Sequence, residues 1–260
     1  MITPVLRSEW IKLRTSRATY VSLFAALALG LGVGLLDVLG VTGHWTTMSA
    51  ADRAAFDPVG DPLSGFQFGE LAFGALGVLA ASTEYATGMI RATLTATPRR
   101  GLVYAAKALA VGLLALAAAQ ICVFAAFFAG QLVLRKQHLQ VSVADPHVAR
   151  AVLGVGVYMA VVTFVGFGLG ALLRHTAGAM SAMFALVFLA YPVARTFEAS
   201  SYLPDHLILI NAATAVGSTM PATGPHAQRI PTLGFAWLDL ALYVVVFLAL
   251  GAWRALRDVD

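Results

Sequence analysis

The sequence has few charged residues and a single cysteine, and these two shortages narrow the kinds of protein it can be. Of its 260 residues, 12% are charged and 59% are hydrophobic, whereas soluble domains carry about a quarter charged residues. This composition provides too little polar surface to cover a water-soluble globule, so it predicts a membrane protein. Cys122 has no second cysteine to pair with, which excludes an intrachain disulfide.

Several motifs that carry catalytic chemistry are also missing. The sequence contains no GxxxxGK[ST], so it has no P-loop for ATP, and it contains no GxSxG, HExxH or CxxC. Its six histidines are scattered over predicted loops without the spacing of metal ligands. Basic residues fall in short groups between apolar runs, which argues against nucleic-acid binding. We therefore expect a chain that is not an enzyme, with no catalytic residue, no metal site and no bound cofactor of its own.

Long apolar runs dominate what the sequence does contain. A membrane-spanning helix needs about 20 apolar residues, and six segments meet this requirement to within a few residues. The predicted fold is therefore all-α, a polytopic membrane protein with one transmembrane domain over residues 1–260. The six predicted spans cover residues 18–41, 66–83, 102–134, 148–173, 176–195 and 233–253.

The distribution of charge predicts how these spans are oriented. Six spans put both termini on one side of the membrane, and most of the 17 lysines and arginines lie on that side. The positive-inside rule then predicts a multi-pass protein of the cell membrane with both termini cytoplasmic. The first apolar run is longer than the core of a signal peptide and lacks an Ala-x-Ala cleavage site, so we expect it to remain.

The pattern of apolar and basic side chains in residues 1–17 predicts a helix that lies in the membrane interface. Such a helix places Trp10 and Leu13 toward one side, while Lys12 and Arg14 are able to reach lipid phosphates. The alternative is a positively charged topology signal before the first span.

Residues 196–232 mix a proline-containing start with an apolar run too short to cross the membrane. This pattern predicts a short helix or a re-entrant element on the outer side, ended by Pro221, Gly224 and Pro225.

The ionisable residues inside the spans are few. Asp37, Glu70 and Asp239 lie toward the outer ends of their predicted helices, where solvation explains them best and a gate or substrate vestibule is the alternative. The spans therefore contain no buried charge that would select an ion or an acid, which favours a hydrophobic or amphipathic substrate such as a drug, lipid or peptide. Lys107 is expected to lie where the third span projects into water.

Two groups of residues bear on packing within the membrane. Gly30-x-x-x-Gly34 and Gly166-x-x-x-Gly170 each put small residues on one helix face and predict close packing within the chain. A second group, of methionine and aromatic side chains in the fifth predicted span, favours core packing. The alternative is a path for a hydrophobic substrate. The members of this group are Met180, Met183, Phe184 and Tyr191.

Residues 84–101, EYATGMIRATLTATPRRG, interrupt the apolar pattern with a polar segment. Pro98 disfavours helix at the residue before it, so we expect a helix of about ten residues capped by Thr87. Ile90 and Leu94 form an apolar stripe at i, i+4 spacing. We expect Glu84 to be held near Arg91, and the flanking pair Arg99 and Arg100 to lie at the level of the phosphates.

Three segments carry a resemblance to a known family. They are SEWIKLRTSRATYV before the first span, E-Y-x-T-G-x-I-R-x-T-L-x-x-x-P-R-R after the second, and YLPDHLILINAATAV before the last. Over essentially the whole chain, the sequence resembles the permease subunit of ABC-2 type transporters in the actinobacterial style. In that family these segments are an interfacial connecting helix, a cytoplasmic coupling helix and an extracellular re-entrant element.

The resemblance implies a membrane subunit of an ATP-driven exporter. It implies a homodimer of this chain with two copies of a separate P-loop ATPase, which binds the ATP and Mg. On this hypothesis Glu84 and Arg91 fix the coupling helix, and Ile90 and Leu94 insert into the partner. The alternatives are a non-transport assembly or sensory partner of an ATPase, and an integral membrane hydrolase, for which no catalytic pair is found at one depth. The residues leave the substrate open.

Overall fold

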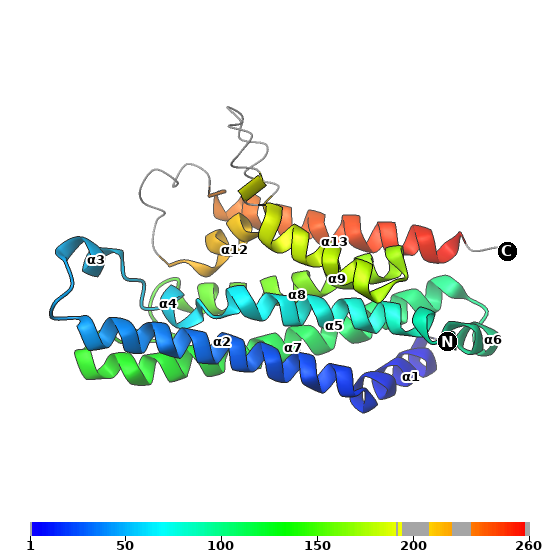
Figure 1. Cartoon of the computed structure of the whole chain (residues 1–260), viewed down its shortest axis with the longest axis horizontal. Helices are drawn as coiled ribbons and strands as arrows, with labels where there is room; N and C mark the ends of the chain where they lie inside the picture. The colour runs from blue at the N-terminus through cyan, green and yellow to red at the C-terminus, as the bar shows by residue number, and fades with distance from the viewer. Residues whose placement is uncertain (1, 191, 194–207, 220–229, 258–260) are drawn as a thin grey trace.

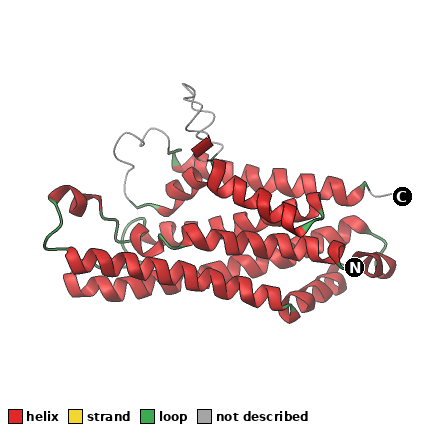
Figure 2. Ribbon diagram, viewed as in Figure 1, coloured by secondary structure: helices red, strands yellow, loops and turns green. Residues whose placement is uncertain are grey.

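The computed structural model describes residues 2–190, 192–193, 208–219 and 230–257, and every regular element among them is helical. Five helical segments are long and apolar enough to cross a membrane. They are α2 (Arg17–His44), α5 (Phe66–Ala86) with the short α4 (Gly60–Leu63) before it, α7 (Arg100–Leu134), α8 (Val148–Leu173) and α13 (Leu233–Leu256). The predicted all-α membrane fold is confirmed at this level (Figures 1 and 2).

Shorter helices connect these segments. They are α1 (Ile2–Thr15), α3 (Ala50–Ala55), α6 (Met89–Ala96), the 3₁₀ turn η1 (Arg135–Gln137), α9 (Thr176–Phe184), the π-helical turn η2 (Ala185–Leu189) and α12 (Leu209–Gly217). The predicted span 176–195 corresponds to α9 and η2. The apolar helix over Thr176–Leu189 is shorter than the about 20 residues that a crossing needs. Residues 191, 194 and 195 of the predicted span lie outside the described ones. Six spans therefore stay a prediction.

A tight helical hairpin joins α8 to α9, as the two residues between the predicted fourth and fifth spans require. Helix α8 ends at Leu173 and α9 begins at Thr176, so only two residues join them. Arg174 adopts the left-handed conformation with φ 55°, which reverses the chain direction. The His175 ring caps α9 by accepting a hydrogen bond from the Gly178 N–H at 3.1 Å.

Helix α8 is the centre of the bundle, since α5, α7, α9 and α13 all pack against it. In its most apolar stretch 78% of the residues are buried, against 22% in α2 and 11% in α13. Phe24 of α2 and Val245 of α13 are among the large apolar side chains left exposed. Outer helices with exposed apolar side chains suit a lipid environment.

Glycines allow the central helices to approach closely. A Cβ at Gly34 would collide with the carbonyl group of Pro62, and one at Gly166 would collide with the carbonyl group of Gly74. Gly30 and Gly170 similarly face other parts of the same chain, the Phe66 ring and the carbonyl group of Val78. The predicted packing within the chain is therefore confirmed for both glycine pairs.

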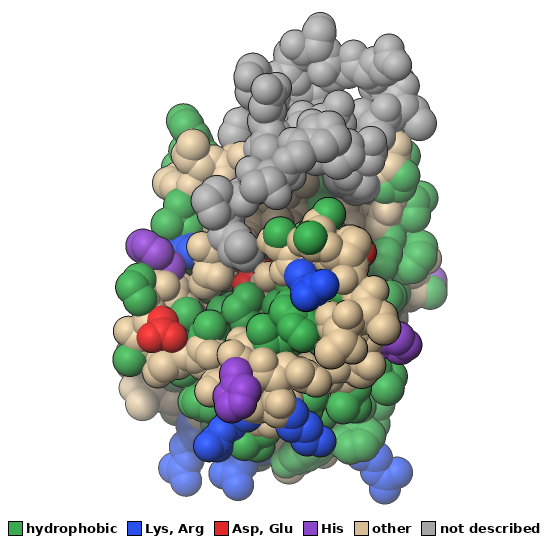
Figure 3. Space-filling view, turned by 90° about the vertical axis from the view of Figure 1, so that its left-hand side faces the viewer, with side chains coloured by type: hydrophobic (Ala, Val, Ile, Leu, Met, Phe, Trp, Pro, Cys, Tyr) green, Lys and Arg blue, Asp and Glu red, His purple; other side chains and the backbone are tan. Residues whose placement is uncertain are grey.

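The two ends of the bundle carry different short elements. Figure 1 places the start of α1, α6 and the end of α13 at one end, and α3 and α4 at the other. Figure 3 looks onto the end with α3 and α4, where a few charged and histidine side chains lie among apolar and uncharged ones.

The predicted re-entrant region 196–232 is described only in part. Helix α12 lies within it and packs against α8 and α13, with Leu209, Ala212 and Val216 buried. The residues around α12, which include Pro221, Gly224 and Pro225, lie outside the described residues.

Candidate functional site

The segment between α5 and α7 folds into the short helix that the sequence predicts. Gly88 adopts a left-handed conformation, with φ 72°, and turns the chain from α5 into α6. The N-cap of α6 is Gly88 and not Thr87, because the Thr87 hydroxyl instead donates to the Thr83 carbonyl of α5 at 2.8 Å. Helix α6 ends at Ala96, two residues before Pro98, as expected.

One face of α6 rests on the bundle. Ile90 and Leu94 are partly buried and line a cavity of about 40 Å³ together with Tyr104 of α7 and Phe167 of α8. Arg100 also lines this cavity. The apolar stripe of α6 therefore points toward the chain's own helices.

The opposite face of α6 is exposed. Its exposed residues are Arg91, Ala92, Thr95 and Ala96. We call these four residues the outer face of α6. It combines one positive charge with small and apolar side chains, and it lies at the end of the bundle that holds α1 (Figure 1).

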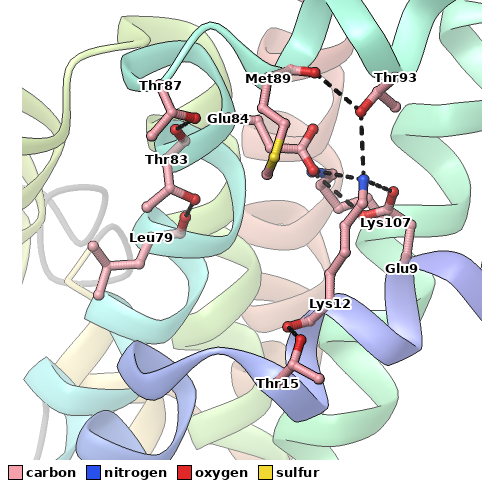
Figure 4. A network of polar contacts seen from close by, with 10 residues as sticks. All are labelled: Glu9, Lys12, Thr15, Leu79, Thr83, Glu84, Thr87, Met89, Thr93 and Lys107. Atoms are coloured by element: carbon pink, nitrogen blue, oxygen red, sulfur yellow. Dashed lines mark hydrogen bonds and ion pairs between the residues drawn. The ribbon is translucent and has the colours of Figure 1, made fainter.

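Two carboxylates and two ammonium groups meet beneath α6, in what we call the ion cluster (Figure 4). Lys12 Nζ lies 2.7 Å from Glu9 Oε1 and 2.8 Å from Glu84 Oε1. Lys107 Nζ lies 2.6 Å from Glu84 Oε1 and 3.4 Å from Glu9 Oε2. Lys12 also donates to the Thr93 hydroxyl of α6 at 3.5 Å. The ion cluster therefore connects α1, α5, α6 and α7.

The ion cluster is largely withdrawn from water. Glu9 and Glu84 are each 3% exposed and Lys107 is 8% exposed. Burial lowers the pKa of Lys12, but hydrogen bonds and charge attraction from Glu84 and Glu9 outweigh this effect, so its pKa is raised above the ordinary value. Its ammonium form is thus stable across the physiological pH range, and the four charges balance.

These contacts correct three expectations from the sequence. Glu84 pairs with Lys12 and Lys107, whereas it was expected near Arg91. Lys12 was expected to reach lipid phosphates but bonds to carboxylates of the same chain. Lys107 was expected near water but is buried. In each case a charged group inside the bundle is stabilised by an opposite charge from a distant part of the sequence.

The other predicted interface residues lie at the same end as the ion cluster. Arg14 and Arg99 are exposed, and Arg100 is partly buried. In α1, Leu13 is buried against the bundle, while Trp10 is 37% exposed. Trp10 and Leu13 therefore face different surroundings, and α1 packs against α7. The position of α1 in the membrane interface stays a prediction.

An arginine joins the helical hairpin to this end of the bundle. The guanidinium of Arg174 lies over the Tyr85 ring of α5, 4.8 Å from its centre, and donates to the Arg254 carbonyl of α13 at 2.9 Å. A stacked guanidinium of this kind contributes both charge and packing. Helices α5, α8 and α13 are thereby connected next to α6.

Three of the four residues predicted for a substrate path come together. Met180, Met183 and Phe184 line a cavity of about 370 Å³ with Leu71 of α5. Met183 is buried and packs against α5, while Met180 and Phe184 are exposed. The fourth residue, Tyr191, lies outside the described residues.

Sequence reasoning missed Glu9 and Lys107 as members of the site. Glu9 precedes Lys12 by three residues, a spacing that brings side chains together on a helix, so this pair could have been found. The contact between Lys12 and Glu84 spans 72 residues and has no local signal.

Comparison with known protein families and with curated proteins gives no match for this chain.

Proposed function

We propose that this chain is the membrane subunit of an ATP-driven exporter and that α6 is the segment contacted by a separate ATPase. The observation that carries the proposal is the arrangement of α6, a short helix held to the bundle on one face and exposed on the other. The sequence pattern of residues 84–101, which resembles the coupling helix of ABC-2 permeases, supports the same assignment.

The ion cluster gives α6 the attachments that such a role requires. If a partner displaces a short helix, the displacement reaches the membrane helices only when the segments that join them to the short helix are rigid. Glu84 is in the last turn of α5 and Lys107 in the first turns of α7, so the two helices flanking α6 share one buried set of charges. Lys12 extends this set to α1 and α6.

The proposal divides the predicted contact residues into two groups. Arg91 and the rest of the outer face of α6 are placed to meet a partner, because they are exposed. Ile90 and Leu94 face the cavity beneath α6 and would hold the helix in place. Their direct contact with the ATPase stays a prediction, and so does the role of Glu84, which acts through the ion cluster.

The remaining features of the proposal come from the family resemblance and from charge distribution. They are a homodimer with two ATPase copies, ATP and Mg held by the partner, six spans in the cell membrane, and cytoplasmic termini. Figure 1 places the start of α1, the end of α13 and α6 at the same end of the bundle, which suits a cytoplasmic ATPase at that end.

The test is to co-express the chain with a candidate P-loop ATPase, starting with any that is encoded beside its gene, to purify the two together and to measure ATP turnover and export in vesicles. Arg91→Glu reverses the charge of the outer face, and Ala92→Trp adds bulk to it. We expect each variant to lower membrane-subunit-dependent ATP turnover and export at least tenfold. Arg135→Glu makes the same charge change at an exposed position beyond α7 and should leave both unchanged.

Three outcomes decide between the alternatives. If both α6 variants couple and transport like the unmodified chain, α6 is not the docking helix. If ATP turnover responds to the variants but no candidate compound crosses the membrane, the chain is a non-transport partner of the ATPase. If no ATPase co-purifies, the exporter proposal fails.

A further inference from the structure

A third cavity lies at the end of the bundle opposite α6. Its volume is about 400 Å³, and it is lined by α4, the first turns of α5, the middle of α8 and one face of α12. Pockets of a few hundred cubic ångströms with mostly apolar walls and a few polar groups are typical binding sites for small molecules.

Glu70 is the buried polar group of this cavity. It is 1% exposed, although the sequence predicted a solvated residue at a helix end. Its Oε2 atom accepts a hydrogen bond from the hydroxyl of the buried Tyr158 on α8. Its Oε1 atom is buried without a hydrogen-bond partner among the described residues, and so is the Ser64 hydroxyl in the same cavity wall. Buried polar atoms without partners are rare because each one costs free energy.

The charge around the cavity is negative. Asp57, Asp61 and Glu70 all line it, and no lysine or arginine is among its described lining residues. The nearby guanidinium of Arg150 donates to the carbonyl groups of Val216 and Ser218, at 3.2 and 2.7 Å. Its hydrogen bonds therefore go to α12 and not to the carboxylates. Among the described residues no positive group pairs with Glu70, so a cation in the cavity would stabilise the charged form of this carboxyl group.

The walls indicate which kind of cation fits. Val155, Ile210 and Ala213 contribute apolar surface, which a hydrated metal ion would not use. Among the described residues, no group of three or more histidine, cysteine, aspartate or glutamate side chains is arranged to hold a metal ion. An ammonium group attached to an apolar body matches both the carboxylate and the walls.

We propose that this cavity binds an amphipathic organic amine in its protonated form, with the ammonium group against Glu70 Oε1 and Ser64 Oγ. The apolar part of the amine would lie against Val155 and Ile210. The inference rests on the cavity and not on the proposed partner ATPase. If the exporter proposal also holds, amphipathic amines are the class of compound to test for export.

The experiment is calorimetric titration of the full chain, without any ATPase, in phosphatidylcholine nanodiscs at pH 7.4, with empty nanodiscs as blank. The probe is 4-phenylbutylamine, which is protonated at this pH, and its neutral match is 4-phenylbutanol. We expect saturable binding of one amine per chain and at least tenfold weaker binding of the alcohol. Glu70→Gln keeps the shape of the side chain and should weaken amine binding at least tenfold.

Two further variants keep the test decisive. Val155→Trp fills the cavity without changing any carboxylate and should abolish binding, which covers the case in which Glu70→Gln does not fold. Asp52→Asn removes one negative charge from exposed α3, at the same end of the bundle but outside the cavity, and should leave binding unchanged.

Any of four results would overturn the inference. They are no saturable binding, equal binding of the alcohol, equal binding to the Glu70→Gln and unmodified chains, and displacement of the amine by millimolar Ca²⁺. The last result would identify a metal site instead. Because no ATPase is present, these failures are separate from a failure of the exporter proposal.

Discussion

Replacing Glu84 with glutamine tests whether the ion cluster holds the end of the bundle near α6 together. The substitution keeps the size of the side chain but removes one of two negative charges. Lys12 and Lys107 then share Glu9 alone, at 2.7 and 3.4 Å. The buried group changes from balanced charge to one excess positive charge, without losing side-chain volume.

The expected magnitude follows from burial. Removing one partner from a buried ion pair costs about 3 to 5 kcal/mol. The side chain of Lys12 is 35% exposed, so water screens part of the excess charge. We therefore expect Glu84→Gln to lower the free energy of unfolding by about 3 kcal/mol, at the lower end of that range. Lys107→Met, which leaves one excess negative charge, should have a similar effect.

The double variant Glu84→Gln, Lys107→Met supplies the sharper test. It leaves Glu9 paired with Lys12, so the charges balance again. We expect the two substitutions together to cost about 2 kcal/mol less than the sum of their separate effects, a coupling within the range for residues in contact. The measurement is reversible unfolding in mixed micelles, followed by circular dichroism during titration with sodium dodecyl sulfate.

Lys136→Met is the matched control, because Lys136 is exposed at the far end of α7. It should change the free energy of unfolding by no more than about 0.5 kcal/mol. If the costs of Glu84→Gln and Lys107→Met add to within about 0.5 kcal/mol in the double variant, the four charges do not act as a unit and the reasoning from burial is wrong.

Two pairs of glycine substitutions test backbone geometry and helix packing by the same unfolding assay. Gly88→Ala places a Cβ at a left-handed φ of 72° and should lower the free energy of unfolding by about 1 to 2 kcal/mol. Its control is Gly101→Ala in the first turns of α7, where the added Cβ meets only ordinary contacts. This control should be neutral or slightly stabilising. Gly166→Ala forces a Cβ against the carbonyl group of Gly74 and should cost at least about 1 kcal/mol as overpacking; Gly32→Ala, with open space around it, should not destabilise. Equal effects at Gly166 and Gly32 would contradict the close packing of α5 and α8.

Local signals predicted the helices because their causes are local. The apolar run 148–173 coincides with α8, since a helix that is apolar on all sides can be read without knowing its neighbours. Pro98 disfavours helix at the residue before it, and α6 ends at Ala96. The hairpin at Arg174 and His175 followed from the two residues available between apolar runs.

The buried charges could not be predicted in the same way. Hydropathy places Glu70 near the end of a span, but the cavity at Glu70 is also lined by α4 and α12, which lie outside the predicted spans. Helix α4 extends the second span back to Gly60, so the end predicted at residue 66 is not a solvated end. Glu84 likewise needed the positions of Lys12 and Lys107, which only tertiary packing provides.

Glu70 and Glu84 lie on the same helix, and this connection bears on how the two ends of the bundle could communicate. Fourteen residues separate them, a distance of about 21 Å along the axis of α5. Between them α5 packs closely along α8, where Gly74 meets Gly166 and Gly77 meets the Thr163 carbonyl. Two helices packed backbone to backbone resist sliding past each other. If a partner displaces α6, α5 and α8 should therefore move as one unit, and the cavity at Glu70 would change where this unit meets α4 and α12.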